Sequence, residues 1–205
     1  MTSRGKRSTD VALASLLLLV TAPVSALVAL LVRLRLGRPV VFTQSRPGLA
    51  GRPFGMHKFR TMTNAVGTDG ALLPDSRRLT PLGRFLRVSS LDELPELFDV
   101  VRGDMSLVGP RPLLHRYTGH LTASERRRLD VLPGITGWAQ VNGRNAASWD
   151  QRLAMDVWYV DNRSWRLDLR ILAMTLARVL FRRGAVADPG SAMQDLDVER
   201  QARCP

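Results

Sequence analysis

The longest apolar stretch of the chain lies near its start, where residues 11–32 carry no charge and consist mostly of Leu, Val and Ala. A straight helix of this length measures about 33 Å, enough to cross the hydrocarbon core of a membrane. Pro23 falls near the middle, where it removes one backbone hydrogen bond and bends the helix. The parts on its two sides, about 18 Å and 14 Å long, are each too short to cross a membrane.

Three interpretations of this stretch differ in where its two ends lie. A secretory signal peptide would be cleaved after residues 24–26, but the apolar run continues beyond that point. A spanning helix is the usual outcome, yet the positive-inside rule requires an asymmetry of basic residues that the two ends do not show. A re-entrant helix brings both ends to one anionic surface, so we favour it. The basic residues are Arg4, Lys6 and Arg7 on one side and Arg33, Arg35 and Arg38 on the other.

The middle of the chain alternates short apolar patterns with turn residues. Residues 40–44 are typical of a strand, and residues 54–62 continue it as a small sheet or hairpin beyond Gly- and Pro-rich turns. Residues 82–88 form a short helix or an extended link. Apolar residues at helical spacing predict helices over residues 121–132, with Thr122 and Glu125 as a capping box, and over residues 151–160.

The last third of the chain holds three further segments. Residues 133–149 carry almost no charge and indicate a loop. Residues 166–183 predict an amphipathic basic helix, and the pattern leaves open whether it packs on the core or lies in the membrane interface. Beyond Gly184 the chain turns polar, which predicts a disordered tail.

Composition narrows the class of partner. The 205 residues suffice for one domain with a core, and the net charge of +12 calls for nucleic acid, anionic lipid or a phosphorylated substrate. Lys6 and Lys58 are the only lysines among 30 basic residues, so Lys58 stands out. The single cysteine, Cys204, excludes an internal disulfide or a cysteine metal site.

The residues best suited to chemistry begin with the run SLDELPEL from position 90. A helix starting here would be capped by Ser90, in a capping box with Glu93, or by Asp92, which would place Pro95 in the tolerated first turn. As capping acids, Asp92 and Glu93 would simply be stabilised by the helix dipole. The same position keeps a carboxylate ionised, so one acid could attack phosphorus while its neighbour holds Mg²⁺ or a proton.

Charged residues elsewhere could complete such a site. Lys58 and Arg60 are two apart and would share one face of a strand, as a surface basic patch or as ligands of one diphosphate. Arg111 lies between two prolines that fix its backbone, and would bind phosphate or form a structural ion pair. Asp156 lies on an otherwise apolar helix and is either the partner of an arginine or a further acid of the site.

Several blocks in fixed order, from about residue 5 to residue 183, resemble the bacterial sugar transferase family and its small monotopic phosphoglycosyl transferases. Members typically have Ser-Pro at the break of the apolar helix, where this chain has Ala22-Pro23 and could use the Thr21 hydroxyl to satisfy the freed carbonyl. Asp99 replaces a frequent Asn and is expected on a helix surface. The blocks are the proline-broken helix, KFRTM at 58–62, SLDELPEL at 90–97, GDMSLVGPRPLL at 103–114, PGITGWAQVNGRN at 133–145 and DVWYV at 156–160.

The resemblance implies an enzyme at the cytoplasmic face of the bacterial inner membrane. It would transfer a sugar 1-phosphate from a UDP-sugar to polyprenyl (undecaprenyl) phosphate and release UMP. Asp92 would attack the sugar-bearing phosphorus, form a covalent phosphosugar intermediate and bind Mg²⁺, with Glu93 as ligand or base. Anionic lipid, and not nucleic acid, would then account for the basic surplus, and a homodimer is left open. The phosphate- and substrate-binding residues would be Lys58, Arg60, Arg111 and Asp156.

The predicted architecture is therefore an α+β, mainly helical, monotopic membrane protein with a re-entrant helix, interfacial amphipathic helices and a small β element. Its parts would be the membrane helix and its flanks over residues 1–38, a cytoplasmic catalytic domain over 39–183 and a tail over 184–205. Two alternatives stay open. A basic membrane-tethered binding protein would explain the charge but not the acid pair, and a spanning, non-covalent transferase would use Asp92 only to bind metal.

Overall fold

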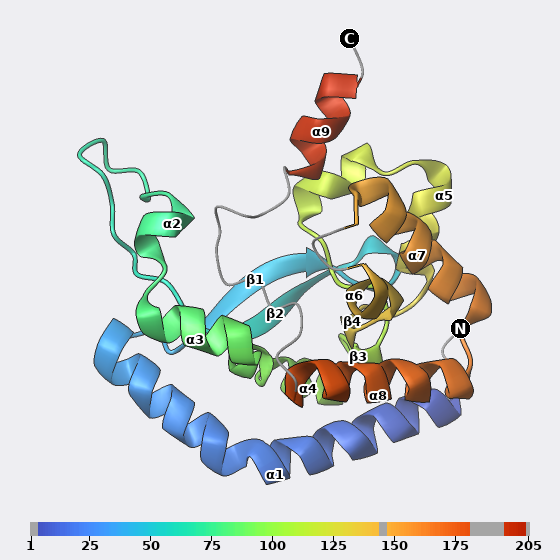
Figure 1. Cartoon of the computed structure of the whole chain (residues 1–205), viewed down its shortest axis with the longest axis horizontal. Helices are drawn as coiled ribbons and strands as arrows, with labels where there is room; N and C mark the ends of the chain where they lie inside the picture. Colours follow the sequence, from blue (N-terminus) through green and yellow to red (C-terminus); the bar gives the residue numbers. More distant parts are fainter. Residues whose placement is uncertain (1–3, 144–146, 181–194, 204–205) are drawn as a thin grey trace.

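The computed structural model describes residues 4–143, 147–180 and 195–203, which are drawn as ribbons in Figure 1. This part of the chain is mainly helical and carries two small sheets of two strands each. The predicted α+β class with a small β element is therefore confirmed. The predicted boundary between residues 183 and 184 lies outside the described residues.

The elements follow one another in short steps after one long helix. The helices are α1 (Arg4–Leu36), α2 (Asp75–Arg78), α3 (Pro81–Ser89), α4 (Glu96–Arg102), α5 (Ala123–Arg126), α6 (Trp138–Asn142), α7 (Trp149–Asn162), α8 (Trp165–Leu180) and α9 (Leu196–Arg203). The strands are β1 (Val41–Pro47), β2 (Pro53–Phe59), β3 (Ser106–Val108) and β4 (Gly134–Thr136). The 3₁₀ turns are η1 (Leu49–Gly51), η2 (Leu91–Glu93), η3 (His115–His120) and η4 (Arg127–Asp130).

The hairpin of β1 and β2 forms where the sequence pattern predicts it. The two strands pair antiparallel over their whole length. Gly51, in the turn between them, has a φ of +74°, a left-handed conformation that favours glycine. Phe54 and Met56 point into the main core, and Lys58 follows them in the same alternation. The hairpin thus carries Lys58 to the edge of the core, beside α4.

A second, parallel pair joins β3 and β4, which the sequence analysis missed. Three-residue strands buried on both faces show no alternation, so the predicted loop over residues 133–149 instead contains β4, α6 and the start of α7. Gly109 passes so close to this pair that an added Cβ would lie 2.4 Å from the Leu132 carbonyl oxygen. Because only glycine permits this approach, Gly109 fixes where the loop after β3 begins.

The helices over the second half of the chain agree with prediction in place but not always in length. Thr122 and Glu125 form the predicted capping box, yet α5 ends at Arg126 and the chain continues as the 3₁₀ turn η4. Helix α7 covers the predicted residues 151–160 and extends beyond both ends, with Ser148 and Gln151 as its capping box.

Helix α1 is bent near its middle, where Pro23 lies, and runs along one side of the molecule next to α3 and α8 (Figure 1). Both of its ends contact the rest of the protein. Near its start, Lys6 pairs with Asp168 of α8 at 2.6 Å, and Arg7 donates to two carbonyl oxygens at the end of α4. Near its other end, apolar residues of α1, β2 and α3 form one cluster: Val28, Val32, Phe59 and Leu86.

The Thr21 hydroxyl does not take the expected place at the bend. Pro23 lacks the N–H that would bond to the carbonyl of Leu19, four residues earlier. The Thr21 hydroxyl donates instead to the Leu17 carbonyl oxygen at 2.7 Å. The expectation was wrong because a threonine hydroxyl in a helix reaches the carbonyl four residues before its own position.

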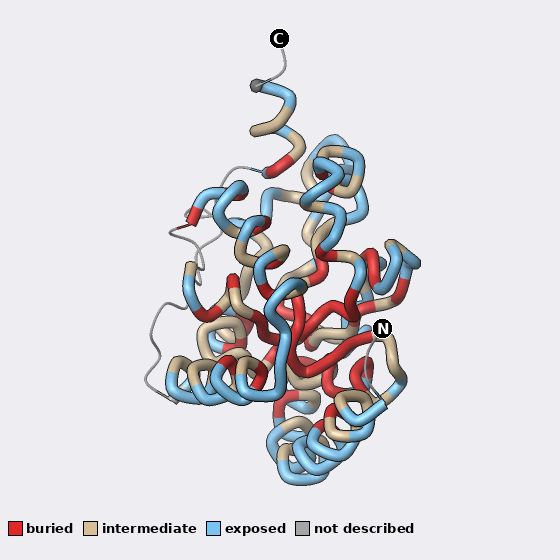
Figure 2. Tube along the Cα trace, turned by 90° about the vertical axis from the view of Figure 1, so that its right-hand side faces the viewer, coloured by how far each residue is buried: buried red, intermediate tan, exposed pale blue. Residues whose placement is uncertain are grey.

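Apolar side chains are exposed along α1 and α8. Leu19 of α1 is 74% exposed, and Leu169 and Leu176 of α8 are 62% and 60% exposed, whereas Ile171 of α8 is fully buried. Helix α8 therefore packs one face on the core and presents apolar residues on another. Figure 2 shows exposed turns at the bottom of the molecule, where α1 lies. Within the described residues, α1 alone is long and apolar enough to cross a membrane.

The end of the chain differs from the predicted disordered tail. Residues 196–203 form helix α9, and Leu196 is fully buried in a cluster with Tyr117 and Trp149. Arg200 pairs with Glu125 at 2.6 Å and with Asp150 at 2.7 Å. These contacts hold α9 against the rest of the protein although its composition is polar. Residues 184–194 of the predicted tail lie outside the described residues.

Candidate active site

The acid pair lies in a separate 3₁₀ turn between α3 and α4. Ser90 has a φ of 58° and ends α3 in the left-handed conformation, and its side chain caps nothing. Helix α4 begins only after Pro95. Both predicted caps, Ser90 and Asp92, were therefore wrong, since the helix starts beyond the proline that cannot donate a backbone hydrogen bond. Asp92 and Glu93 are held by the turn η2 instead of by a helix start.

Glu93 is shared by two cations that come from distant parts of the chain. Lys58 of β2 donates to Glu93 Oε1 at 2.8 Å, and Arg111 donates to the same oxygen. These charges hold the pKa of Glu93 well below its usual range, against the effect of burial. Glu93 in turn raises the pKa of Arg111. The carboxylate thus ties the hairpin and the Pro-Arg-Pro loop to the turn η2.

Asp92 has no such partner. Its side chain is 7% exposed, and its carboxylate makes no hydrogen bond or ion pair within the described residues. Burial, followed by the negative charge of Glu93, raises the pKa of Asp92 to about 6, while Lys58 and Arg111 act in the opposite direction. The carboxylate is mostly ionised at pH 7 and has no hydrogen bond to break before it reacts. A desolvated, unpaired carboxylate near cations is suited to attack an anionic phosphorus centre.

A third carboxyl group in the same run was missed by the sequence analysis. Glu96, at the start of α4, is almost fully buried and lies 3.0 Å from Lys58 Nζ. Burial and the charge of Glu93 raise the pKa of Glu96 to about 7. Its position three residues after Glu93 was the available signal, because side chains at that spacing share a helix face. Lys58 is thereby placed between two carboxyl groups.

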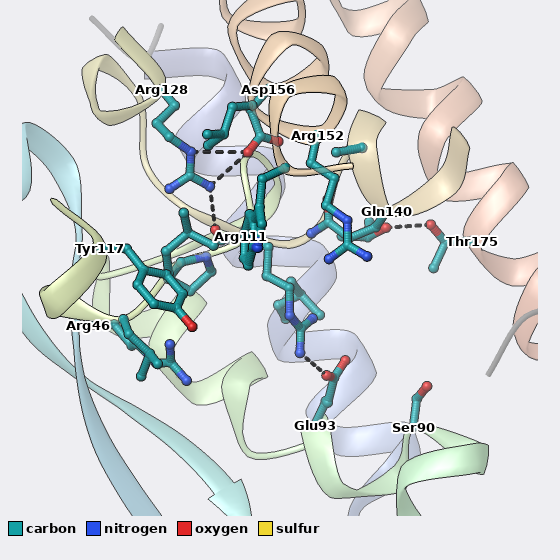
Figure 3. Close-up of a pocket in the computed structure, with 18 of the residues that line it drawn as sticks. Arg46, Ser90, Glu93, Arg111, Tyr117, Arg128, Gln140, Arg152, Asp156 and Thr175 are labelled. Carbon is teal, nitrogen blue, oxygen red and sulfur yellow. Dashed lines mark hydrogen bonds and ion pairs between the residues drawn. The ribbon is translucent and has the colours of Figure 1, made fainter. Parts of the chain in front are cut away.

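Arg111 is fixed in place through its backbone. Gly134 N–H donates to the Pro110 carbonyl oxygen at 3.0 Å, which attaches the loop to β4. Arg128 donates to the Arg111 carbonyl oxygen at 2.6 Å and also pairs with Asp156 at 2.8 Å (Figure 3). Asp156 is therefore the partner of an arginine, one of its two predicted roles. Asp156 acts on Arg111 indirectly: its buried carboxylate binds Arg128, and Arg128 holds the Arg111 carbonyl oxygen.

Arg60 also has its donors engaged by the protein. It lies just after β2, and its guanidinium donates to the carbonyl oxygens of Met62 and Arg38, both at 2.9 Å. It lines the same small cavity as Lys58 and Asp92. The structure thus brings the five predicted residues together: Lys58, Arg60, Asp92, Glu93 and Arg111. Arg60 differs from the others in that it binds backbone carbonyl groups and so fixes the chain after β2.

Two cavities meet at this cluster. The smaller, of about 420 Å³, contains Asp92 and Lys58, and the larger, of about 580 Å³, extends past Arg111 toward α6, α7 and α8. Four residues line both cavities: Arg46, Arg87, Glu93 and Arg111. Arg46 and Arg87 were missed because neither belongs to a local pattern with the acid pair. Their charges add to those of Lys58 and Arg111 at the junction of the two cavities.

Asp99 is buried, contrary to the expectation that it lies on the helix surface. It is fully buried on α4 and accepts from the backbone N–H of His57 at 2.9 Å and from the ring Nδ1 of His57 at 2.6 Å. Burial raises the pKa of Asp99, whereas His57 opposes the shift. The pair joins β2 to α4 next to Lys58. It was missed because His57 lies 42 residues before Asp99.

Among the acidic side chains at this site, Asp92 is the one best placed to bind a divalent cation. The described residues hold no group of three acidic, histidine or cysteine side chains that would enclose a metal ion. Asp92 has an unpaired carboxylate beside a cavity, and Mg²⁺ is commonly held by one or two carboxylates together with substrate phosphates and water. The residues present therefore fit an Mg²⁺ ion that Asp92 holds jointly with a phosphorylated substrate.

An unpaired acid among fixed cations, in a domain bearing a long apolar helix, is suited to phosphoryl chemistry at a membrane. The chain belongs to the bacterial sugar transferase family, whose sequence model matches residues 1–182. The resemblance predicted from the sequence blocks is therefore confirmed.

Three relatives indicate the range of the family. The chain is 52% identical to the uncharacterized sugar transferase EpsL of Bacillus subtilis over 179 residues, which are 87% of this chain and 89% of EpsL. It is 40% identical to the undecaprenyl-phosphate glucose phosphotransferase of Komagataeibacter xylinus, over 88% of this chain and 36% of that protein. It is 36% identical to the undecaprenyl-phosphate galactose phosphotransferase of Salmonella typhimurium, over 88% of this chain and 41% of that protein. The chain thus spans less than half of the two longer relatives.

Asp92→Asn is expected to stabilise the folded protein at pH 7.5. Because the pKa of Asp92 is raised from 3.8 to about 6, the wild type carries a buried, unpaired charge above pH 6 that costs up to about 3 kcal/mol of unfolding free energy. The folded state binds the proton more tightly than the unfolded state, so this cost shrinks as the pH falls from 6 to 3.8. Thermal unfolding of both proteins at pH 7.5 and pH 4.5 measures it.

The matched control for this experiment is Asp75→Asn. Asp75 is exposed and paired with Arg78, so its loss should change stability by no more than about 0.5 kcal/mol at either pH. An Asp92→Asn protein that melts below the wild type at pH 7.5 would show that the carboxylate has a stabilising partner, contrary to its geometry.

Proposed function

We propose that this protein is a phosphoglycosyl transferase that moves a sugar 1-phosphate from a UDP-sugar to undecaprenyl phosphate and releases UMP. The observation that carries the proposal is the buried, unpaired Asp92 beside Lys58 and Arg111. Relatives named as undecaprenyl-phosphate glucose and galactose phosphotransferases support the same reaction. Such a transfer is the first membrane step in the synthesis of a glycoconjugate or exopolysaccharide.

The reaction proceeds in two displacements at one phosphorus atom. A carboxylate oxygen of Asp92 attacks the sugar-bearing phosphorus of the UDP-sugar, and the bond to the bridging oxygen breaks, so UMP leaves with that electron pair. Asp92 then carries the sugar phosphate as a mixed anhydride. An oxygen of undecaprenyl phosphate attacks the same phosphorus, and the Asp92 carboxylate is released. The product is an undecaprenyl diphosphate sugar, and no proton is gained or lost at phosphorus.

The charges around Asp92 serve the attack of an anion on an anion. Lys58 and Arg111 are held by Glu93 at the junction of the two cavities, where they offset the charge of the diphosphate. Asp156 and Arg60 position the backbone on either side. When bound, Mg²⁺ would be held by Asp92 and the substrate phosphates and would supply further neutralisation of the oxygens. The assisting role of Glu93 as ligand or base is part of the proposal.

The position of α1 supports a re-entrant helix. Its first turns are tied to α8 and α4, and its last turns pack on β2 and α3, so both ends lie against the same domain. A straight spanning helix would carry one end to the far side of the membrane. The exposed apolar residues of α1 and α8 would then lie among lipid tails at the cytoplasmic face of the inner membrane, with basic residues toward anionic headgroups.

The reaction is tested by Mg²⁺-dependent release of UMP by the detergent-solubilised protein, with undecaprenyl phosphate and a panel of UDP-sugars. Wild type is expected to release UMP from one or two donors and to lose this activity with EDTA. Asp92→Asn should reduce the rate at least about 1,000-fold, because it removes the nucleophile. Asp161→Asn, an exposed acid whose partner Arg127 also lies outside both cavities, should keep the wild-type rate.

Release of UMP from no donor by the folded wild type would contradict the proposal. The basic membrane-tethered binding protein would then be the better account. Equal rates for Asp92→Asn and the wild type would contradict the role of Asp92 while leaving the overall reaction in place.

Membrane topology is tested with two single cysteines in a Cys204→Ser background. Ser8→Cys reports the start of α1, and Thr43→Cys reports the domain; both positions are exposed. A membrane-impermeant maleimide should label neither position in intact spheroplasts and both in inverted membrane vesicles, because the helix returns to the cytoplasmic face. Labelling of Ser8→Cys alone in spheroplasts would show a spanning helix and contradict the re-entrant arrangement.

A further inference from the structure

The larger cavity contains polar groups that the proposed reaction does not use. It lies beyond Arg46 and Arg111 as seen from Asp92, and Asp92 itself lines only the smaller cavity. Its walls combine the rings of Tyr117 and Trp149 with polar side chains from α6 and α8. Figure 3 shows Arg46, Tyr117, Gln140 and Thr175 among the side chains that line this cavity. A volume of about 580 Å³ falls within the range of small-molecule sites.

Gln140 is the most unusual group in this cavity. Both its Oε1 and its Nε2 are buried, and neither has a hydrogen-bond partner among the described residues. A buried amide without partners is costly, and nearly all buried polar groups in proteins are satisfied. Gly137 makes room for it, since an added Cβ there would lie 2.7 Å from Gln140 Oε1. An amide kept unsatisfied beside a cavity indicates that a ligand supplies its partners.

Arg46 gives a second, independent indication at the other end of the cavity. Its Nε is buried without a hydrogen-bond partner, and a terminal nitrogen of the same guanidinium donates to Gln44 Oε1 at 2.7 Å. Burial, followed by the positive charge of Arg111, lowers the pKa of Arg46 to about 10. Both guanidinium groups line the junction of the two cavities, and their combined positive charge there favours an anionic ligand. That anion would lie at the junction of the two cavities.

The identity of the ligand follows from the geometry, given the proposed function. The sugar-bearing phosphorus must reach Asp92 in the smaller cavity, so the other half of a UDP-sugar extends past Arg46 and Arg111 into the larger one. A side-chain amide offers one donor and one acceptor side by side, which matches the N3–H and carbonyl of uracil. The aromatic and apolar wall suits a flat base. We propose that the larger cavity binds the UMP half of the donor, with Gln140 on the uracil and Arg46 on the phosphate.

Binding to the full chain by isothermal titration calorimetry tests the inference without requiring turnover. Gln140→Met keeps the length of the side chain but removes both hydrogen-bonding atoms. It is expected to weaken UMP binding about tenfold and to leave ribose 5-phosphate binding unchanged. Its melting temperature without ligand should equal or exceed that of the wild type, because no protein hydrogen bond is lost. Gln201→Met, at an exposed position on α9, is the control and should bind UMP as the wild type does.

Arg46→Gln provides the complementary variant, and it keeps the inference testable if Gln140→Met does not fold. It should weaken UMP and ribose 5-phosphate alike, by about tenfold or more, and leave uridine binding unchanged. Equal UMP affinity in Gln140→Met and wild type would overturn the assignment of the uracil. Equal UMP affinity in Arg46→Gln and wild type would overturn that of the phosphate.

The binding test of this cavity can fail or succeed independently of the UMP-release test of the proposed function. UMP binding that depends on Gln140 and Arg46 would support the inference even if no UMP were released from any donor. If the wild type releases UMP but neither Gln140→Met nor Arg46→Gln weakens UMP binding, the proposed reaction stands and the proposed UMP site is overturned. A wild type that binds neither UMP nor a UDP-sugar would overturn both.

Discussion

The shared carboxylate of Glu93 is the contact on which the arrangement of the site depends. It accepts from Lys58, on the hairpin, and from Arg111, on the loop after β3, and so joins parts of the chain that are far apart in sequence. Because Glu93 occupies these cations, the adjacent Asp92 is left buried and unpaired. Two neighbouring acids thus have different surroundings: Glu93 is paired with two cations, and Asp92 is unpaired, as the proposed attack on phosphorus requires.

The residues that support this contact are connected to α1 and α8, the helices with exposed apolar side chains. The Arg111 carbonyl is held by Arg128, which is paired with Asp156 of α7. Lys58 is also paired with Glu96 of α4. The end of α4 in turn receives Arg7 from α1, whose neighbour Lys6 pairs with α8. Polar contacts of Lys58 therefore join Glu93, the neighbour of Asp92, to Glu96 on α4, and the end of α4 is bonded to α1.

Much of the site could be predicted from the sequence, because Asp92, Glu93, Lys58 and Arg111 lie in compact, recognisable runs. The local geometry could not, since Pro95 forces α4 to begin later than a capping pattern suggests. Asp99 was placed on the surface because its partner His57 is distant in the chain. Arg46 carries no local signal, and Gln140 lies in a block, residues 133–145, that indicated only the family resemblance and no role for this side chain. They become informative only when the fold shows that their polar atoms are buried without partners.

The central claim is that Asp92 is a nucleophile and not only a metal ligand. Intact-protein mass spectrometry after mixing the enzyme with its UDP-sugar, in the absence of undecaprenyl phosphate, tests it most directly. The account predicts a mass increase equal to one sugar phosphate, located on Asp92, absent in Asp92→Asn and discharged when the lipid phosphate is added. Release of UMP only in the presence of the lipid phosphate, with no adduct under any condition, would show direct transfer and contradict it.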